Sequence, residues 1–276
     1  MKRTVLLILS VLLVLSLFSC ESQEKIKADF TVYCFNAGAA DSFLIRTKNS
    51  AVLIDTAESS FGDEITDYLS SQGIDRLDYL IITHFDKDHV GGAAKVLKSI
   101  SVENVLQSNY TKDTSKKYDN YVSALSYARI EAVTVREELR FSLDGAEFTV
   151  NPPEQEVYEK SASNNSSLIV SVRYGERQFL FCGDAEKERL SEFIGMNTEK
   201  YDFVKIPHHG RWNSKIPELL SSVSPAYAVI TSSAAEPEDK KTVDALESFG
   251  TEIFYTKNAP VRVVCDGTHI AVEYAE

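Results

Sequence analysis

Apolar runs and polar breaks alternate along most of the chain. Runs rich in Val, Ile, Leu and Phe and bounded by Gly, Asp, Asn or Ser predict β-strands, whereas apolar residues at helical spacing predict helices. The predicted strands are 30–35, 42–47, 51–55, 77–82, 102–106, 133–135, 147–151, 168–174, 178–182, 203–206, 227–231, 253–255, 261–265 and 270–274, and the predicted helices are 62–71, 92–99, a stretch ending at Ile130, 186–194, 216–223 and 241–249. Because this scheme recurs in two similar halves, it predicts two sheets packed face to face with helices outside.

The first twenty residues follow a different pattern. A basic pair, Lys2 and Arg3, precedes a long apolar run that ends in Leu-Phe-Ser-Cys, which predicts a secretory signal over residues 1–20. The cysteine resembles the modified residue of a bacterial lipoprotein, so we expect a lipid on Cys20 and a domain outside the cytoplasmic membrane. A plain secretory signal or an uncleaved anchor is the alternative, because Phe18 departs from the usual lipoprotein signal.

The polar residues 21–27 are predicted to form a tether, and residues 28–276 a single domain. No second apolar run of membrane-spanning length follows the signal. The other cysteines, Cys34, Cys182 and Cys265, each lie in a predicted strand, and we expect buried free thiols there.

The chain is acidic, with a formal net charge of -12. A surface of this sign repels polyanions, so tight binding of long nucleic acid is disfavoured. Local basic groups are still expected to attract a single phosphate; they are Lys205, Arg211, Lys215, Lys240 and Lys241.

The densest cluster of candidate ligands follows the strand predicted at 77–82. His84, Asp86, Asp88 and His89 fall within six positions, although the chain has only five histidines. Along extended backbone His84 and Asp86 project to one side, and Asp88 and His89 then turn into the next helix. Two neighbouring pairs of ligands predict two divalent metal ions. Imidazole and carboxylate donors suit zinc first, with manganese or iron as alternatives.

Two later strands also end in candidate ligands. Asp184 follows the strand at 178–182, where its carboxylate is expected to bridge both ions. His208 and His209 follow the strand at 203–206. Adjacent side chains point in different directions, so one histidine is expected to bind metal while the other faces substrate. The sequence leaves the choice open; our working assignment gives the metal to His209 and a catalytic role to His208.

In this order, five segments resemble the metallo-β-lactamase superfamily, and within it the branch of ComEC-type DNA-uptake proteins. The segments are NAGAADSFLIRT, AVLIDTA, LDYLIITHFDKDHVGG, NNSSLIVSVRYGERQFLFCGDAE and DFVKIPHHG. The resemblance implies an α/β fold in four layers, αββα, with a two-metal site at one edge of the sandwich. It further implies a distribution of the ligands: His84 and Asp86 on one ion, Asp88 and His89 on the other, Asp184 between them, and His208 or His209 completing the second ion.

The chain departs from the family pattern at three places. Asp86 stands where many members have histidine, which leaves the metal less defined. A further family histidine is absent, and Asn164 or Asn165 occupies that region, either as a contact to substrate or water or as part of a plain loop. Residues 236–240 replace the Gly-His-Pro of ComEC-type domains, which puts that histidine's part in the chemistry in doubt.

Two aspartates are expected to support the centre from outside the ligand set. Asp41 matches the family's Gly-Asp-Ser, and Asp55 follows the strand at 51–55. We expect Asp55 to anchor loop amides, because metal ligands need such groups to orient them.

Two divalent ions would lower the pKa of a shared water to about 7, so no serine or cysteine nucleophile is needed. Oxygen-rich ligation favours a phosphate ester. We therefore expect an extracytoplasmic phosphodiesterase with Asp88, Asp184 and His208 as catalytic residues, acting on a small substrate such as a cell-wall ester, a lipid headgroup or a short nucleotide. The alternatives are hydrolysis of a carboxylic ester, thioester or lactam, and a non-catalytic, lipid-anchored, metal-containing binding module. The oligomeric state is not indicated.

Overall fold

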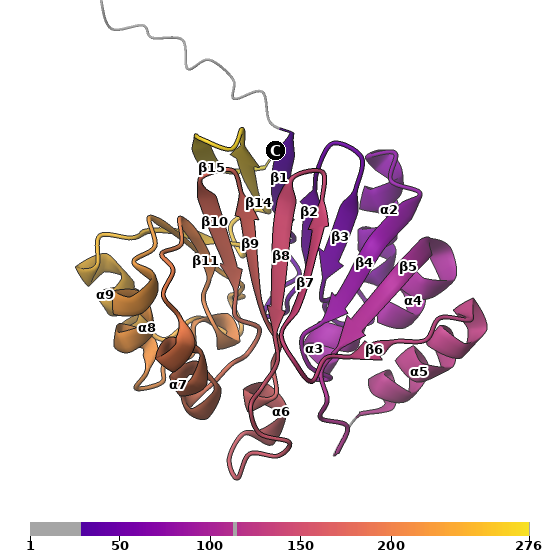
Figure 1. Ribbon diagram of the computed structural model, residues 1–276, viewed down its shortest axis with the longest axis horizontal. Coiled ribbons are helices and arrows are strands. Elements are labelled where there is room, and N and C mark those ends of the chain that lie inside the picture. The colour runs from indigo at the N-terminus through magenta and orange to yellow at the C-terminus, as the bar shows by residue number, and fades with distance from the viewer. Residues whose placement is uncertain (1–28, 113–114, 276) are drawn as a thin grey trace, which may run out of the picture.

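The computed structural model describes residues 29–112 and 115–275. The predicted signal, Cys20 and the tether at 21–27 lie outside these residues. Two mixed β-sheets pack face to face between two layers of helices (Figure 1). The predicted αββα sandwich is therefore confirmed.

The eight-stranded sheet has the order β15-β14-β1-β2-β3-β4-β5-β6, and the seven-stranded sheet has the order β13-β12-β11-β10-β9-β8-β7. The strands of the first sheet are β1 (Phe30–Cys34), β2 (Phe43–Arg46), β3 (Ala51–Ile54), β4 (Arg76–Ile82), β5 (Ser101–Gln107), β6 (Val133–Thr134), β14 (Val261–Cys265) and β15 (Ile270–Tyr274). Those of the second are β7 (Leu139–Leu143), β8 (Ala146–Asn151), β9 (Ile169–Tyr174), β10 (Arg177–Phe181), β11 (Phe203–Lys205), β12 (Tyr227–Ile230) and β13 (Glu252–Tyr255). The last two strands thus return to the sheet built by the first half.

Helices cover the outer face of each sheet (Figure 1). The first sheet carries α2 (Gly62–Ser71), α4 (Ala93–Ser99) and α5 (Lys116–Ala128), and the second carries α7 (Lys187–Met196), α8 (Ile216–Val223) and α9 (Lys240–Ser248). Three short elements lie in loops: α3 (Lys87–Val90), α6 (Ala162–Asn165) and the 3₁₀ turn η1 (His208–Gly210). None of the described helices is long and apolar enough to span a bilayer.

Alternation along the strands builds the core between the sheets. Phe30, Val32 and Cys34 of β1 point inward, and they meet Phe179 and Phe203 of the second sheet in one buried cluster. Each sheet forms one further buried cluster with the helices on its outer face. Cys34, Cys182 and Cys265 are buried free thiols, as predicted.

The sequence analysis placed most elements within two residues but missed four. It did not predict the edge strand β7 or the short elements α3, α6 and η1. The three short elements are single turns, which carry too few residues to show a helical period.

Candidate metal centre

The candidate ligands follow strands that run parallel to one another. In the first sheet β3, β4 and β5 are parallel, and in the second β10, β11 and β12 are parallel. The carboxyl ends of parallel strands form the usual crevice for chemistry in α/β proteins. The loops that leave these ends carry Asp55, His84, Asp184, His209 and Thr231. The helices α3 and α6 also lie at this end of the sandwich, opposite the C-terminus (Figure 1).

Four side chains converge on one point. Asp88, His89, Asp184 and His209 each offer one donor atom, and these atoms all lie within 4.8 Å of one another. Asp184 uses both oxygens: Oδ1 lies 3.2 Å from His89 Nε2, and Oδ2 lies 3.2 Å from His209 Nε2. His209 Nε2 is also 3.3 Å from Asp88 Oδ2. This places Asp184 at the middle of the group, as a bridging carboxylate requires.

His84 and Asp86 form the neighbouring pair. His84 Nε2 lies 3.7 Å from Asp86 Oδ2, and the ring centroids of His84 and His89 are 4.1 Å apart. The two residues are not part of the compact group of four. The arrangement is thus one dense set of donors beside a sparser one.

Three buried nitrogens test whether the residues fit metal ions. The Nε2 atoms of His84, His89 and His209 have no hydrogen-bond partner among the described residues. Each faces a carboxylate oxygen instead, at 3.7 Å for His84, 3.2 Å for His89 and 3.2 Å for His209. Imidazole nitrogens and carboxylate oxygens held this close together are the donors that divalent ions bind. The cluster is compatible with a dinuclear centre.

Asp55 orients His89. Its Oδ2 lies 2.8 Å from His89 Nδ1, while Oδ1 accepts the Thr83 amide at 2.8 Å and Oδ2 also accepts the Thr83 hydroxyl. Asp55 therefore anchors a loop amide, as expected, and turns His89 Nε2 toward Asp184. Burial opposes protonation of His89, but the Asp184 and Asp55 carboxylates hold its pKa well above the usual value.

A second buried network orients His209. Asp41 Oδ1 accepts the Thr231 hydroxyl at 2.6 Å, and Thr231 Oγ1 lies 3.0 Å from His209 Nδ1. Asp41 Oδ2 pairs with the ammonium of Lys205. Burial opposes ionisation of Asp41, but Lys205 and His209 hold its pKa below the usual range. Asp41 thus lies behind a ligand, where the sequence analysis expected it.

Lys205 corrects one expectation. It was predicted to be among the basic groups that attract a phosphate, but its side chain is fully buried. On β11 it shares the inward face with Phe203, two residues before it, because side chains alternate along a strand. Its partners are all internal, so Lys205 belongs to the interior of the centre.

His208 lies at the mouth of the centre. Its side chain is 30% exposed, its Nδ1 lies 3.4 Å from Glu186 Oε1, and its Nε2 lies 3.9 Å from Asp184 Oδ2. Asn164 donates to Glu186 at 2.9 Å and lies 3.5 Å from His208 Nε2. Burial lowers the pKa of His208, although Asp184 and Glu186 oppose the shift. His209 therefore points into the group of candidate ligands, and His208 faces the mouth.

Both histidines lie on left-handed backbone. His208, His209 and Gly210 have φ of 49°, 52° and 80°. For residues with a side chain this conformation costs roughly 1–2 kcal/mol each, and such strain is typical of functional sites. The turn aims the imidazole of His208 outward and that of His209 inward.

The structure does not bring Asn165 to the centre. It is fully buried, donates to Lys160 O and Glu188 Oε2 at 2.9 Å, and accepts the Arg189 amide at 3.1 Å. The expected contact with substrate or water fits Asn164 and not Asn165.

Several contributors were not identified from the sequence. Ser163 donates to Asp86 Oδ1, and Ser167 Oγ accepts the Asp184 amide at 3.1 Å and lies 3.4 Å from His84 Nδ1. Glu186 and Thr231 were missed as well. Thr231 directly follows the strand β12, but its role shows only once β12 is known to lie beside β11.

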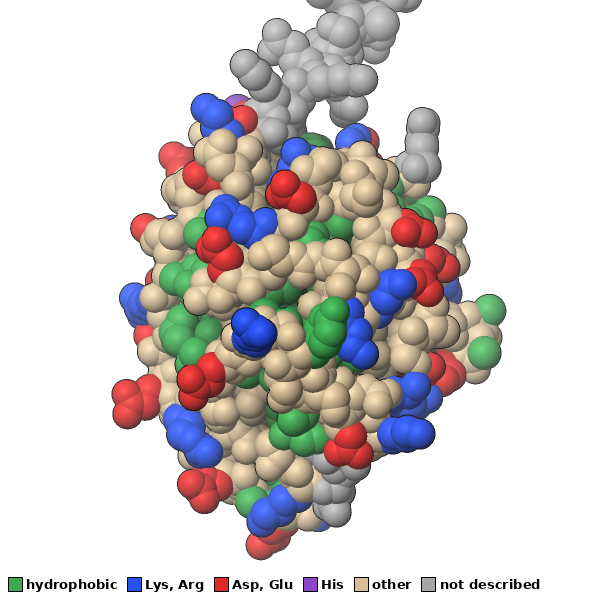
Figure 2. All heavy atoms as spheres, turned by 90° about the vertical axis from the view of Figure 1, so that its right-hand side faces the viewer, with side chains coloured by type: hydrophobic (Ala, Val, Ile, Leu, Met, Phe, Trp, Pro, Cys, Tyr) green, Lys and Arg blue, Asp and Glu red, His purple; other side chains and the backbone are tan. Residues whose placement is uncertain are grey.

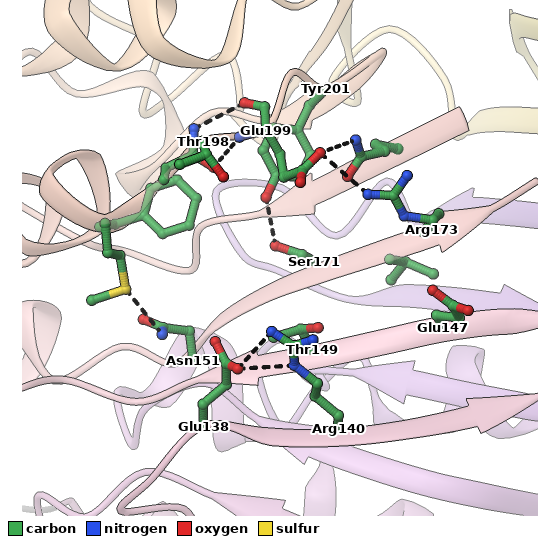
Figure 3. A pocket seen from close by; sticks show the side chains of 15 residues that line it. Glu138, Arg140, Glu147, Thr149, Asn151, Ser171, Arg173, Thr198, Glu199 and Tyr201 are labelled. Atoms are coloured by element: carbon green, nitrogen blue, oxygen red, sulfur yellow. Dashed lines mark hydrogen bonds and ion pairs between the residues drawn. The ribbon is translucent and has the colours of Figure 1, made fainter. Parts of the chain in front are cut away.

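Figure 3 shows a groove elsewhere, on the outer face of β7, β8 and β9. Its volume is about 330 Å³. Arg140 pairs with Glu138 at 2.8 Å, and Arg173 pairs with Glu199 at 3.2 Å, so these charges are already matched. None of the candidate metal ligands lines it.

A profile of the Metallo-beta-lactamase superfamily matches residues 36–232. The chain is 28% identical over 245 residues to ComE operon protein 3 of Bacillus subtilis, and 30% identical over 218 residues to Recombination protein 2 of Haemophilus influenzae. These alignments cover 80% and 76% of this chain but only 30% and 25% of the relatives. The chain therefore spans less than a third of the length of either relative.

Solved structures agree on the fold. The metallo-beta-lactamase fold protein YhfI from Bacillus subtilis has a TM-score of 0.57 at 10% identity, covering 90% of this chain and 100% of YhfI. CmlA, a diiron beta-hydroxylase from Streptomyces venezuelae, has a TM-score of 0.52 at 15% identity, covering 82% of this chain and 52% of CmlA. With the competence-type relatives confirming the ComEC-type resemblance, the chain belongs to the metallo-beta-lactamase superfamily.

Proposed function

We propose that this protein is an extracytoplasmic, metal-dependent phosphodiesterase. Members of its superfamily are generally metal-dependent hydrolases. The observation that carries the proposal is the set of three buried Nε2 atoms, of His84, His89 and His209, that lack a hydrogen bond and each face a carboxylate oxygen of the centre.

The donors divide between two ions. His84 and Asp86 would hold one and Asp88, His89 and His209 the other, with Asp184 shared. Zinc is the first expectation and manganese the second. Two divalent ions bound there would lower the pKa of a bound water to about 7 and polarise the oxygens of the ester. The first ion has fewer protein donors, which leaves room for water and substrate.

His208 is the residue proposed to move a proton. Glu186 Oε1 lies 3.4 Å from its Nδ1, and its Nε2 lies 3.9 Å from Asp184 Oδ2, at the mouth. A neutral imidazole in this position is able to accept a proton and return it to the leaving oxygen. Asn164 bonds Glu186 and lies beside Nε2, so it supports the orientation of both groups.

The proposed substrate is a small phosphate ester. Oxygen donors favour phosphate, and the acidic chain disfavours a long polyanion. Acidic and basic side chains intermingle over the face covered by α2, α4 and α5, which does not favour a continuous basic track there (Figure 2). The activities of the much longer competence relatives are therefore not carried over as a whole.

The proposed lipid on Cys20 would orient the domain. Cys20 lies nine residues before Asp29, a span of at most about 30 Å when extended. The strand β1 begins at the end of the sandwich opposite α3 and α6 (Figure 1). An anchor of this kind would direct the metal centre away from the membrane, which favours a soluble or cell-wall substrate over a headgroup of the same bilayer.

A panel of substrates with matched metals tests the proposal. The purified domain from residue 21 onward should hydrolyse phosphodiesters in preference to carboxylic esters, thioesters and lactams. Asp184→Asn and His84→Ala should lower the rate of hydrolysis by more than about 100-fold, with circular dichroism unchanged. A loss of about 100-fold is the upper end of what removing a residue that only orients a ligand costs. Faster acyl hydrolysis would favour the alternative ester class, and full metal occupancy without turnover on any substrate would favour the binding module.

A further inference from the structure

The bridging position holds a fixed positive charge. Lys205 Nζ donates to Gly183 O at 2.8 Å and lies 3.5 Å from Asp184 Oδ1, the same oxygen that faces His89 Nε2. Lys205 is fully buried, so its charge is little screened by solvent. A cation is thus built in beside the carboxylate that two metal ions would share.

The carboxylates of the centre outnumber its permanent cations. Asp41, Asp55, Asp86, Asp88 and Asp184 all lie in or directly behind the ligand set, whereas Lys205 is the lysine that reaches it among the described residues. Buried carboxylates without a counter-ion destabilise a fold strongly. In the absence of metal, Lys205 therefore helps to hold Asp184 and Asp41 in place, together with the imidazoles of His89 and His209.

The same charge opposes the metal ions, because an ammonium and a divalent ion that share one carboxylate repel each other. From this we infer that Lys205 is a built-in counter-ion of the bridging carboxylate: it stabilises the empty centre and weakens metal binding. The domain then folds with its ligands in position before any ion arrives, and the ions remain exchangeable. The inference rests on the proposed dinuclear centre and is independent of which ester is hydrolysed.

Linkage supplies the test. A substitution that changes stability without touching the centre lowers the free energy of unfolding equally with and without metal. Removing Lys205 should instead lower the free energy of unfolding more in the metal-free protein than in the metal-bound protein. The difference between these two losses equals the gain in the free energy of metal binding. Denaturant unfolding of the whole domain in chelator and in saturating Mn²⁺ measures both losses.

We expect Lys205→Met to bind Mn²⁺ at least about tenfold more tightly, because a repelling charge is removed from the bridging carboxylate. Lys205→Gln keeps a donor for Asp41 and Gly183 O, and it serves if the methionine variant does not fold. The matched control is Arg177→Gln. Arg177 begins β10, at the opposite end of the strand from Asp184, and it pairs with Asp202 and donates to Thr268 O, so its loss should be equal in both conditions.

Two results would overturn the inference. Equal losses with and without Mn²⁺ in both Lys205 variants would make the lysine an ordinary buried ion pair. Weaker Mn²⁺ binding would make it a residue that orients ligands. If the wild-type protein binds no metal, the proposed centre fails and this inference fails with it, whereas metal binding without hydrolysis would leave it standing.

Discussion

The interior and the mouth of the metal centre are built differently. The interior side is fully buried and closely bonded: Asp55 holds His89, and Asp41 with Thr231 holds His209. The mouth side consists of partly exposed groups, His208, Glu186 and Asn164, and the contacts of His208 with the other two are longer, at 3.4 and 3.5 Å. The difference suggests a division of work, in which the interior fixes ligand geometry and the mouth handles substrate and protons.

This division has an energetic basis. Ligands must be aimed before an ion binds, and buried hydrogen bonds to charged groups do so at about 1.5–3 kcal/mol each. Groups that meet substrate need access to solvent, which makes their mutual bonds worth less. Substitutions on the two sides should therefore separate metal binding and stability from turnover.

The largest effect is expected on the interior side, from Asp55→Asn. The amide cannot accept from the Thr83 amide, the Thr83 hydroxyl and His89 together, and it leaves His89 Nδ1 without its carboxylate. We expect a loss of about 3 kcal/mol in stability and of roughly 10–100-fold in metal affinity. Calorimetric metal titration and denaturant unfolding measure the two quantities.

Asp78→Asn is the matched control for that substitution. Asp78 is also buried on β4 and accepts the Ala51 amide at 2.9 Å, but at the opposite end of the strand from His84. It should lose stability and keep its metal affinity. If both variants bound metal equally well, the interior side would not control the ligands.

The backbone that joins the two sides is tested by Gly210→Ala. An added Cβ would lie 2.8 Å from Glu238 Cβ and 3.0 Å from Ile230 Cγ2, at a φ of 80°. We expect a loss of at least about 2 kcal/mol, with metal binding and turnover falling together because His208 and His209 move as one turn. Gly195→Ala is the control, since nothing lies within 4 Å of its Cβ position. A stable Gly210→Ala protein with normal turnover would show that the left-handed turn is not needed.

On the mouth side, Glu186→Gln should affect turnover alone. The amide keeps the shape but lacks the charge that faces His208 Nδ1 at 3.4 Å. We expect kcat to fall by about 10-fold or more, which is part of the roughly 100–10,000-fold that assisted proton transfer contributes, while metal content and melting temperature are unchanged. Loss of metal from this variant would move Glu186 to the interior side.

Much of this centre could be predicted from the sequence, because its ligands follow strands. His84, Asp86, Asp88 and His89 come from one loop, and Asp184 and His209 each follow an apolar run. Lys205 and Thr231 were harder, since each is an ordinary residue in or after a strand. Their roles depend on β11 and β12 lying side by side in parallel, which no single segment reveals.

The missed strand β7 shows a different limit. Leu139, Phe141 and Leu143 alternate with polar residues, and Asp144 and Gly145 form the turn to β8, with φ of 47° and 86°. Two residues of positive φ are typical of a tight hairpin. The period was therefore present in the sequence, although the apolar side chains of this edge strand are only half buried.

The smallest functional effect is expected from Asn164→Ala, and its neighbour makes the comparison sharp. Asn164 bonds Glu186 at the mouth, so its loss should lower kcat/KM by up to about 10-fold, the value of roughly one hydrogen bond, and leave the melting temperature unchanged. Asn165→Ala should do the reverse, because Asn165 makes three bonds, two of which join α6 to α7, and none to the centre. Of two adjacent asparagines, one would then affect turnover and the other stability. If both variants changed the same quantity, the boundary between interior and mouth would not lie at this point of the chain.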